Sequence, residues 1–233
     1  MTSRKKRRRQ KKQGIPTRYI VIIAAVAVLV VGLLVALNGN TSPSATVTEL
    51  PYPTGVTPEG EPYKGSPDAP LQLVEYSDFL CSHCRNFADT LNKLGPDYLE
   101  TGRLQVVFRN FAFLDPVVSD QAAQAAECAL DQGADKFWQY HDLLFASQGG
   151  GLAAYSGSQL EAYARQVDLD VSAFNSCLQS GAKADQVQAD LEEGQSQGVT
   201  GTPTWFLNGQ MVPGELSEAD LRQLLDSKLA AGS

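Results

Sequence analysis

The sequence contains few of the side chains that bind transition metals. Its 233 residues include four cysteines and two histidines, and one pair, Cys81 and Cys84, has the Cys-x-x-Cys spacing. There is no second such pair, and a tetrahedral zinc site would need two more ligands. His83 lies between the two cysteines and cannot readily bind the same ion as both of its neighbours. The sequence therefore argues against a metal site here, and it shows no site for a redox cofactor.

Acidic residues are missing from the first 18 positions, where nine lysines and arginines lie. The other 215 residues hold 10 basic and 26 acidic residues, a net charge of −16. The basic run RKKRRRQKK alone is typical of a nuclear or nucleic-acid-binding patch. An acidic body behind it is unlike a nucleic-acid-binding domain, so we expect no nucleic acid among the partners.

Charge of either sign is missing from residues 19–37, YIVIIAAVAVLVVGLLVAL. This length suits a transmembrane helix of about 20 apolar residues better than the core of a signal peptide, which has about 7–15. No convincing small-x-small cleavage site follows it directly; a cleaved signal peptide and a buried core helix are the alternatives. For an uncleaved anchor in the lipid bilayer, the positive-inside rule keeps the basic tail in the cytoplasm and sends the rest across.

The chain is thus predicted to have a basic cytoplasmic tail (1–18), a transmembrane helix (19–37), a linker (38–67) and a folded domain (68–231). The linker is predicted because this stretch contains six prolines, with several glycines, serines and threonines, and no sustained apolar period. Inside the domain, helical periodicity from about 115 to 198 predicts a helical insertion of roughly 80 residues.

Apolar runs at 71–76 and 104–111 predict two buried strands. Between them, apolar residues recur at helical spacing up to Leu94, and Gly95-Pro96 predicts the end of that helix. Strand, helix and strand in this order predict a parallel pair with a helical crossover, and hence an α/β fold.

The last part of the domain predicts a hairpin and one more helix. The segment 202–213 alternates like two strands, with Asn208-Gly209 as a two-residue turn between them. Ser217 is a suitable N-cap for a final helix, because Asp220 follows three residues later and leucines recur at helical spacing after it.

The first cysteine of the Cys-x-x-Cys pair, Cys81, follows a predicted strand at the start of a predicted helix. The N–H groups of a helix start are unpaired and carry about half a positive charge, so they stabilise a thiolate. His83 can add a donor or a positive charge, and a lowered thiol pKa makes the disulfide oxidising. Cys84, one turn further on, is expected to be buried and to act as the resolving cysteine. An inert bridge in so short a loop would constrain the unfolded chain little, which favours a reactive pair.

Outside the cytosol disulfides persist, so all four cysteines can be paired. Three pairings are possible, and the spacing favours Cys81–Cys84 together with Cys128–Cys177. The second bridge would close a loop of about 50 residues within the helical insertion and contribute about 2–4 kcal/mol to stability. Two free buried thiols are the alternative.

Four motifs in this order, VEYSDFLCSHCRNF, VVFRNF, AAECALDQGADKFWQYHDLLF and GVTGTPTWFLNG, resemble those of the DsbA-type thiol:disulfide oxidoreductases. The resemblance covers about residues 68–230 and implies a thioredoxin fold with an inserted helical subdomain. It is nearest to membrane-anchored DsbA-like proteins of bacteria. That family usually has proline after the first cysteine, where this chain has Ser82, and this position tunes the redox poise.

The resemblance also implies roles for three further residues. Thr202 and Pro203 match the family's cis-proline site beside the active disulfide, where an extended substrate can pair with an open backbone edge; an ordinary strand-edge proline is the alternative. Glu75 stands where the family has a buried acid, and strand alternation independently places it on a buried face. A buried carboxyl has a raised pKa and can exchange protons with Cys84. A carboxylate at a frayed strand end is the alternative.

We therefore expect a single-pass, membrane-anchored enzyme whose extracytoplasmic domain donates the Cys81–Cys84 disulfide to reduced, unfolded secreted or membrane proteins. The resemblance implies re-oxidation by a quinone-linked membrane partner. A reductase or isomerase on the same fold is one alternative, and a non-catalytic anchored binding or chaperone module is the other. The redox potential of the pair would separate an oxidase from a reductase.

Overall fold

A computed structural model describes residues 50–232 of the chain. The predicted basic tail and the predicted transmembrane helix at 19–37 lie outside this part. Within residues 50–232, none of the helices has both the length and the apolar character needed to cross a membrane. The following description therefore concerns the domain alone.

A mixed sheet forms the centre of the domain, and its strands lie in the order β1-β2-β4-β3-β5-β6. β3 and β4 are parallel in register, with Glu75 opposite Phe108, and the other neighbours are antiparallel. The strands are β1 (Thr54–Val56), β2 (Pro62–Gly65), β3 (Leu71–Ser77), β4 (Leu104–Asn110), β5 (Thr204–Leu207) and β6 (Gln210–Pro213). The predicted parallel pair and the predicted hairpin around Asn208-Gly209 are both present.

The predicted linker is wrong for its second half, because β1 and β2 lie within it and belong to the sheet. β2 pairs with β4 along its length. Pro62 takes the first position of β2, where a strand tolerates a residue without an N–H group. Lys64 is buried, and its Nζ donates to Asn92 Oδ1 at 2.7 Å, so a charged residue fills a core position. Short strands rich in proline and polar residues have no periodicity that sequence patterns detect.

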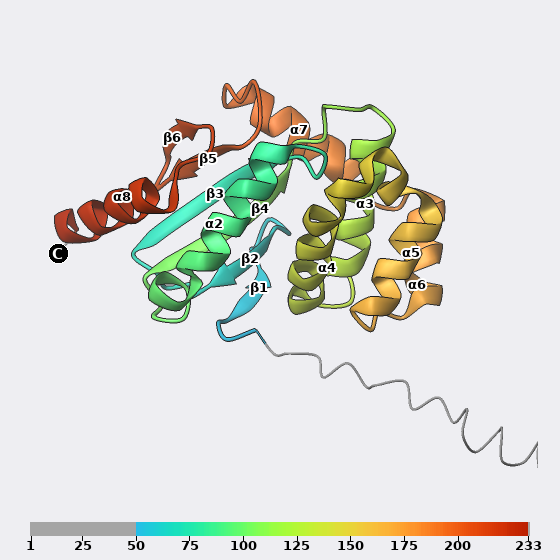
Figure 1. Cartoon of the computed structure of the whole chain (residues 1–233), viewed down its shortest axis with the longest axis horizontal. Coiled ribbons are helices and arrows are strands. Elements are labelled where there is room, and N and C mark those ends of the chain that lie inside the picture. Colours follow the sequence, from blue (N-terminus) through green and yellow to red (C-terminus); the bar gives the residue numbers. More distant parts are fainter. Residues whose placement is uncertain (1–49, 233) are drawn as a thin grey trace, which may run out of the picture. The chain divides into compact units, whose positions relative to one another are not determined.

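Helix α2 (Ser82–Tyr98) makes the crossover between β3 and β4 and crosses them in Figure 1. The predicted end at Gly95-Pro96 is wrong, because the helix continues through Pro96 to Tyr98. A proline inside a helix costs about 3 kcal/mol. Burying an apolar side chain contributes about 1.5–3 kcal/mol, and Tyr98 and Leu99 are both 1% exposed. Tyr98 Oη also donates to Asp226 Oδ1 at 2.8 Å, so contacts after the proline offset its cost.

The predicted helical insertion is confirmed, and Figure 1 shows most of it gathered beside one end of the sheet. It consists of α3 (Val118–Leu130), α4 (Ala134–Ala146), the 3-10 segment η1 (Ser147–Tyr155), α5 (Gly157–Gln166), α6 (Val171–Ser180) and α7 (Ala184–Ser196). The last helix, α8 (Glu218–Ala231), packs on α2, and Ser217 Oγ accepts the Asp220 N–H as its predicted N-cap.

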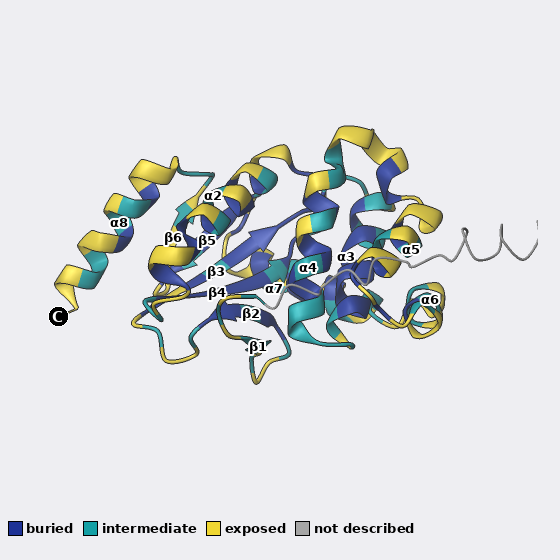
Figure 2. Cartoon of the chain, turned by 60° about the horizontal axis from the view of Figure 1, so that its bottom comes forward, coloured by how far each residue is buried: buried dark blue, intermediate teal, exposed yellow. Residues whose placement is uncertain are grey.

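Both faces of β3 are covered, as the buried colouring of the central strands in Figure 2 shows. The larger core joins one face of β3, with Leu71 and Leu73, to Phe87 and Leu91 of α2. A smaller cluster on the other face includes Tyr76 of β3. The turn that carries the two cysteines therefore follows directly after a strand that is buried on both faces.

Candidate active site

The two neighbouring cysteines lie at the turn from β3 into α2. Cys81 is the N-cap of α2, and its Sγ accepts the Cys84 N–H at 3.4 Å. The same sulfur lies 3.4 Å from the carbonyl oxygen of Thr202. Cys81 is 7% exposed and Cys84 is fully buried, so an attacking group can reach only the first sulfur. Both thiols are free in the structure, which is the reduced form of the pair.

The surroundings of the two sulfurs drive their pKa values apart. A hydrogen bond from the Cys84 thiol, together with backbone N–H groups of Cys84 and His83, lowers the pKa of Cys81 to about 6 despite partial burial. Burial raises the pKa of Cys84, and the hydrogen bond to Cys81 and the charge of Glu75 add to this. At neutral pH Cys81 is therefore mostly a thiolate, while Cys84 keeps its proton.

The two residues between the cysteines are exposed. Ser82 begins α2 and faces solvent. The His83 ring contacts Glu215, with 3.0 Å between Nδ1 and Oε1. The carboxylate of Glu215 raises the pKa of His83. Glu215 was not among the predicted site residues, because a glutamate in the loop before α8 has no sequence signal that connects it to the cysteines.

Thr202-Pro203 is a cis peptide bond, at the position that the resemblance implied. The carbonyl oxygen of Pro203 accepts the Gly214 N–H at 2.8 Å. Gly214 O in turn accepts Trp205 Nε1 at 2.9 Å, and the Trp205 ring stacks on Phe87 of α2 with 5.4 Å between centroids. The loop beside Cys81 is thus fastened to the same helix that carries the cysteines.

Glu75 is buried in the middle of the sheet, and the alternative of a frayed strand end is wrong. It pairs with Phe108 on one side and Trp205 on the other, and 2% of it is exposed. Burial raises its pKa to about 7, against the effects of the neighbouring Ser77 side chain and the charge of Lys64, and the charge of Cys81 raises it further. Its Oε1 has no hydrogen-bond partner among residues 50–232.

The other two cysteines form a disulfide between α3 and α6. Cys128 and Cys177 are joined with a Cα–Cα distance of 5.9 Å, within the usual range for a disulfide. The bridge ties two helices of the insertion and does not contribute an atom to the Cys81 turn.

Two side chains of the helical insertion donate hydrogen bonds to the cysteine turn. Neither was predicted as a site residue. Gln148 Nε2 donates to the carbonyl oxygens of Phe79 and Cys81, at 2.8 and 2.9 Å. Tyr155 Oη also donates to Phe79 O, at 2.8 Å. The helical insertion therefore positions the reactive turn from outside the sheet.

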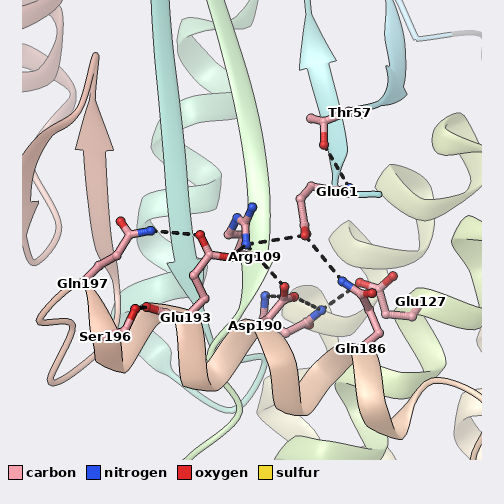
Figure 3. Close-up of polar contacts among 10 residues, drawn as sticks. Thr57, Glu61, Arg109, Glu127, Gln186, Asp190, Glu193, Ser196 and Gln197 are labelled. Atoms are coloured by element: carbon pink, nitrogen blue, oxygen red, sulfur yellow. Dashed lines mark hydrogen bonds and ion pairs between the residues drawn. The ribbon is translucent and has the colours of Figure 1, made fainter. Parts of the chain in front are cut away.

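A second group of buried ionisable side chains lies between β2, β4, α3 and α7 (Figure 3). Arg109 makes ion pairs with Glu61 and Asp190, at 3.6 and 3.7 Å, and with Glu193. Burial raises the pKa of Glu61 to about 8, and that of Glu127 to about 7. These side chains come from distant parts of the sequence, and none was predicted as a site residue.

Comparisons with known proteins bear on the fold and the family of the chain. The thioredoxin family model matches residues 57–227. The probable disulfide bond formation protein D of Bacillus anthracis is 30% identical over 169 residues, which cover 71% of this chain and 76% of that protein. The crystal structure of oxidised BdbD from Bacillus subtilis is similar in fold, with a TM-score of 0.68 and 24% identity over 77% of this chain and 98% of that one.

A different kind of relative is much longer than this chain. The Na(+)/H(+) antiporter NhaA 1 of Salinispora arenicola is 34% identical over 176 residues, which cover 75% of this chain and 26% of the antiporter. This chain therefore spans about a quarter of the length of that relative, and the similarity concerns one portion of it.

Proposed function

Because this chain belongs to the thioredoxin family and, within it, to the DsbA-type thiol:disulfide oxidoreductases, we propose that it oxidises cysteine pairs of other proteins with a Cys81–Cys84 disulfide. The observation that carries the proposal is the placement of Cys81. Its sulfur caps a helix, belongs to the less buried of the two cysteines, and lies 3.4 Å from the carbonyl oxygen of Thr202.

The reaction consists of two exchanges. In the oxidised form a substrate thiolate attacks Cys81 Sγ, the Cys81–Cys84 bond breaks, and Cys84 leaves as a thiolate that takes up a proton. A second substrate thiolate then attacks the substrate sulfur of the mixed disulfide, and Cys81 leaves as a thiolate. Two electrons pass to the enzyme and the substrate gains a disulfide. The low pKa of Cys81 makes it the better leaving group, which drives the second exchange forward.

Glu75 supplies the proton that Cys84 needs in the first exchange. A carboxyl with a pKa of about 7 is close to half protonated at neutral pH, so it can both donate and accept. Its charge also acts on the Cys84 thiol, which places the two groups within electrostatic reach. Lys64, buried nearby, keeps the pKa of this carboxyl from rising further.

The thiolate preference of Cys81 also favours oxidation of substrates. At pH 7 a thiol with a pKa of about 6 stabilises the reduced enzyme by about 1.4 kcal/mol relative to one with the ordinary value of 9.0, and so raises the reduction potential by about 30 mV. We further propose that residues 19–37 anchor the domain outside the cytoplasm and that a quinone-linked membrane protein restores the disulfide. Both proposals rest on sequence pattern and resemblance.

The test is the equilibrium of the Cys81–Cys84 pair with glutathione, together with refolding of a reduced, unfolded protein. We expect a potential well above the value of about −270 mV that is typical of thioredoxin. We also expect disulfide formation in the substrate with the oxidised wild-type domain and none with the Cys81→Ser variant. A potential near that of thioredoxin would identify a reductase instead. Refolding no better than with Cys81→Ser would identify a non-catalytic module.

A further inference from the structure

Asp78, three residues before Cys81, is a buried carboxylate, and both of its oxygens accept hydrogen bonds. It is 1% exposed. Its Oδ1 accepts the Leu80 N–H at 2.8 Å and the Ser119 hydroxyl at 3.0 Å. Its Oδ2 accepts the N–H groups of Phe113 and Leu114, both at 3.0 Å. One side chain thus binds the cysteine turn with one oxygen and the β4–α3 loop with the other.

The main chain of the same residue meets both cysteines. Its carbonyl oxygen accepts the Cys81 N–H at 2.9 Å. Its backbone also lies close enough to the Cys84 sulfur to lower the pKa of that thiol, against the larger effect of burial. Asp78 therefore joins the positions of the two sulfurs to the position of a loop more than 30 residues away in the sequence.

The loop that Asp78 holds presents apolar side chains to solvent. Phe113, Leu114 and Val117 are 40%, 50% and 68% exposed. The backbone that carries them is ordered at its far end, because Asp115 Oδ1 accepts the N–H groups of Val117 and Val118 at 2.9 and 2.8 Å. In Figure 1 this loop and the start of α2 lie at the same end of the sheet. Exposed apolar groups on a fixed loop are typical of a docking surface.

We propose that Asp78 is a positioning residue, which keeps the apolar loop 113–117 in register with Cys81 so that an unfolded protein segment is held while its thiol reaches that sulfur. This inference rests on the proposed function. The occupant is a reduced, extended segment with apolar side chains, because the exposed side chains of the loop are apolar and Asp78 binds both this loop and the turn that carries Cys81. A small dithiol reaches Cys81 without touching the loop.

The effect of losing the carboxylate is confined to the loop by the other bonds of the turn. Gln148 and Tyr155 hold the turn through the carbonyl oxygens of Phe79 and Cys81, independently of Asp78. In an Asp78→Asn variant one of the two oxygens becomes an NH2 group that only donates. The Ser119 hydroxyl can turn to accept from it, but the N–H groups of Leu80, Phe113 and Leu114 cannot, so at least one backbone N–H group loses its acceptor. Because Gln148 and Tyr155 hold the cysteine turn, the loop that carries Phe113 and Leu114 is the part free to move away.

The experiment compares Asp78→Asn with Asp170→Asn, a matched control outside the loop, whose carboxylate also accepts two backbone N–H groups. Asparagine caps a helix start as well as aspartate does, so the control keeps its bonds to Ser172 and Ala173 at the start of α6. Each oxidised variant is mixed with reduced, unfolded ribonuclease A or with dithiothreitol, and the rate of reduction is followed by tryptophan fluorescence. We expect Asp78→Asn to slow the reaction with unfolded protein at least tenfold and with dithiothreitol less than twofold. The control and the equilibrium constant with glutathione should change less than twofold.

An equal loss with both substrates, or no loss with either, would overturn the inference while leaving the proposed function in place. A wild-type domain that oxidises neither substrate would overturn the proposed function itself. Should Asp78→Asn not fold, Ser119→Ala removes one donor to the same carboxylate, and Leu114→Ser alters an exposed side chain of the loop. Each variant is expected to slow the reaction with unfolded protein about threefold and to leave the reaction with dithiothreitol unchanged. A change of the same size with both substrates, relative to the wild type, would overturn the inference.

Discussion

Buried carboxyl groups lie on opposite faces of the sheet, Glu75 on one face and the acids around Arg109 on the other, and burial raises their pKa values. Glu75 faces the helix that carries the cysteines, whereas Arg109, the centre of the other set, projects from the opposite face because it is in register with Tyr76 rather than with Glu75. Glu75 has a pKa of about 7, and Glu61 and Glu127, in the set around Arg109, have values of about 8 and 7.

The partners of Glu75 differ from those of the acids around Arg109. Glu75 Oε1 is unpaired within residues 50–232, and its neighbours in charge are Cys81 and Lys64. The acids of the second set are bonded to Arg109, to Asn110 and to Gln186. A raised pKa therefore does not by itself mark a catalytic residue. The proposed role of Glu75 rests on its raised pKa together with its unpaired oxygen and its position near the cysteine sulfurs.

The largest expected effect comes from removing the cation of the second set. Arg109 is 12% exposed in its side chain, and an Arg109→Met variant leaves buried acids without their counter-charge. We expect the free energy of unfolding, measured by urea titration at pH 7, to fall by about 3–5 kcal/mol. The pKa of Cys81 should not change, because this residue lies on the other face.

The control for that variant is Arg103→Met. Arg103 is 43% exposed and pairs with Asp226 at 3.3 Å, so its loss should cost less than about 1 kcal/mol. A shift in the titration of Cys81 upon Arg109→Met would contradict the comparison, since it would show that the two faces are coupled.

The next effect in size concerns Glu75. A Glu75→Gln variant keeps the shape but cannot transfer a proton, and we expect single-turnover reduction of the oxidised enzyme to slow about 100-fold at pH 7. Stability should stay the same or rise, because burying a neutral amide avoids the cost of burying a charge. The control is Glu61→Gln, which removes an equally buried carboxyl from the other face. Slowing of the same size in the control would show that Glu75 has no special role.

The sequence predicted the parts of the fold that have a clear period. The strands around Leu73 and Val106, the crossover helix and the hairpin at Asn208-Gly209 follow from apolar spacing and turn residues. It did not predict β1 and β2, because their residues alternate poorly and β2 begins with a proline. The end of α2 was also missed, because packing of Tyr98 outweighs the local effect of Pro96.

The sequence predicted the residues of the site that short motifs mark. Cys81, Cys84 and Glu75 lie within ten residues of one another, so strand alternation and a helix start were enough to place them. Glu215 and Gln148 reach the same turn through tertiary contacts, and no local pattern marks such residues. Their positions follow only from how the helical insertion and the last loop pack.

The smallest effect, and the sharpest test of the comparison, is the dependence of stability on pH. Glu61 titrates near 4.5 in the unfolded chain and near 8 in the folded protein. Between these pH values Glu61 has lost its proton in the unfolded chain and keeps it in the folded protein. Its contribution to stability is complete below pH 4.5 and is lost as pH rises through 8, at up to about 1.4 kcal/mol per pH unit. For Glu75 the loss ends near pH 7.

The interval from pH 7 to 8 therefore distinguishes the two faces. Urea unfolding of Glu61→Gln should show a smaller decline in the free energy of unfolding than the wild type over this interval, by at most about 1.4 kcal/mol. Glu75→Gln should differ from the wild-type slope mainly between pH 4.5 and 7 and by less than Glu61→Gln above pH 7, where Glu75 is already more than half ionised. Equal slopes for the two variants above pH 7 would mean that the carboxyl at the cysteines holds its proton as firmly as the one beside Arg109.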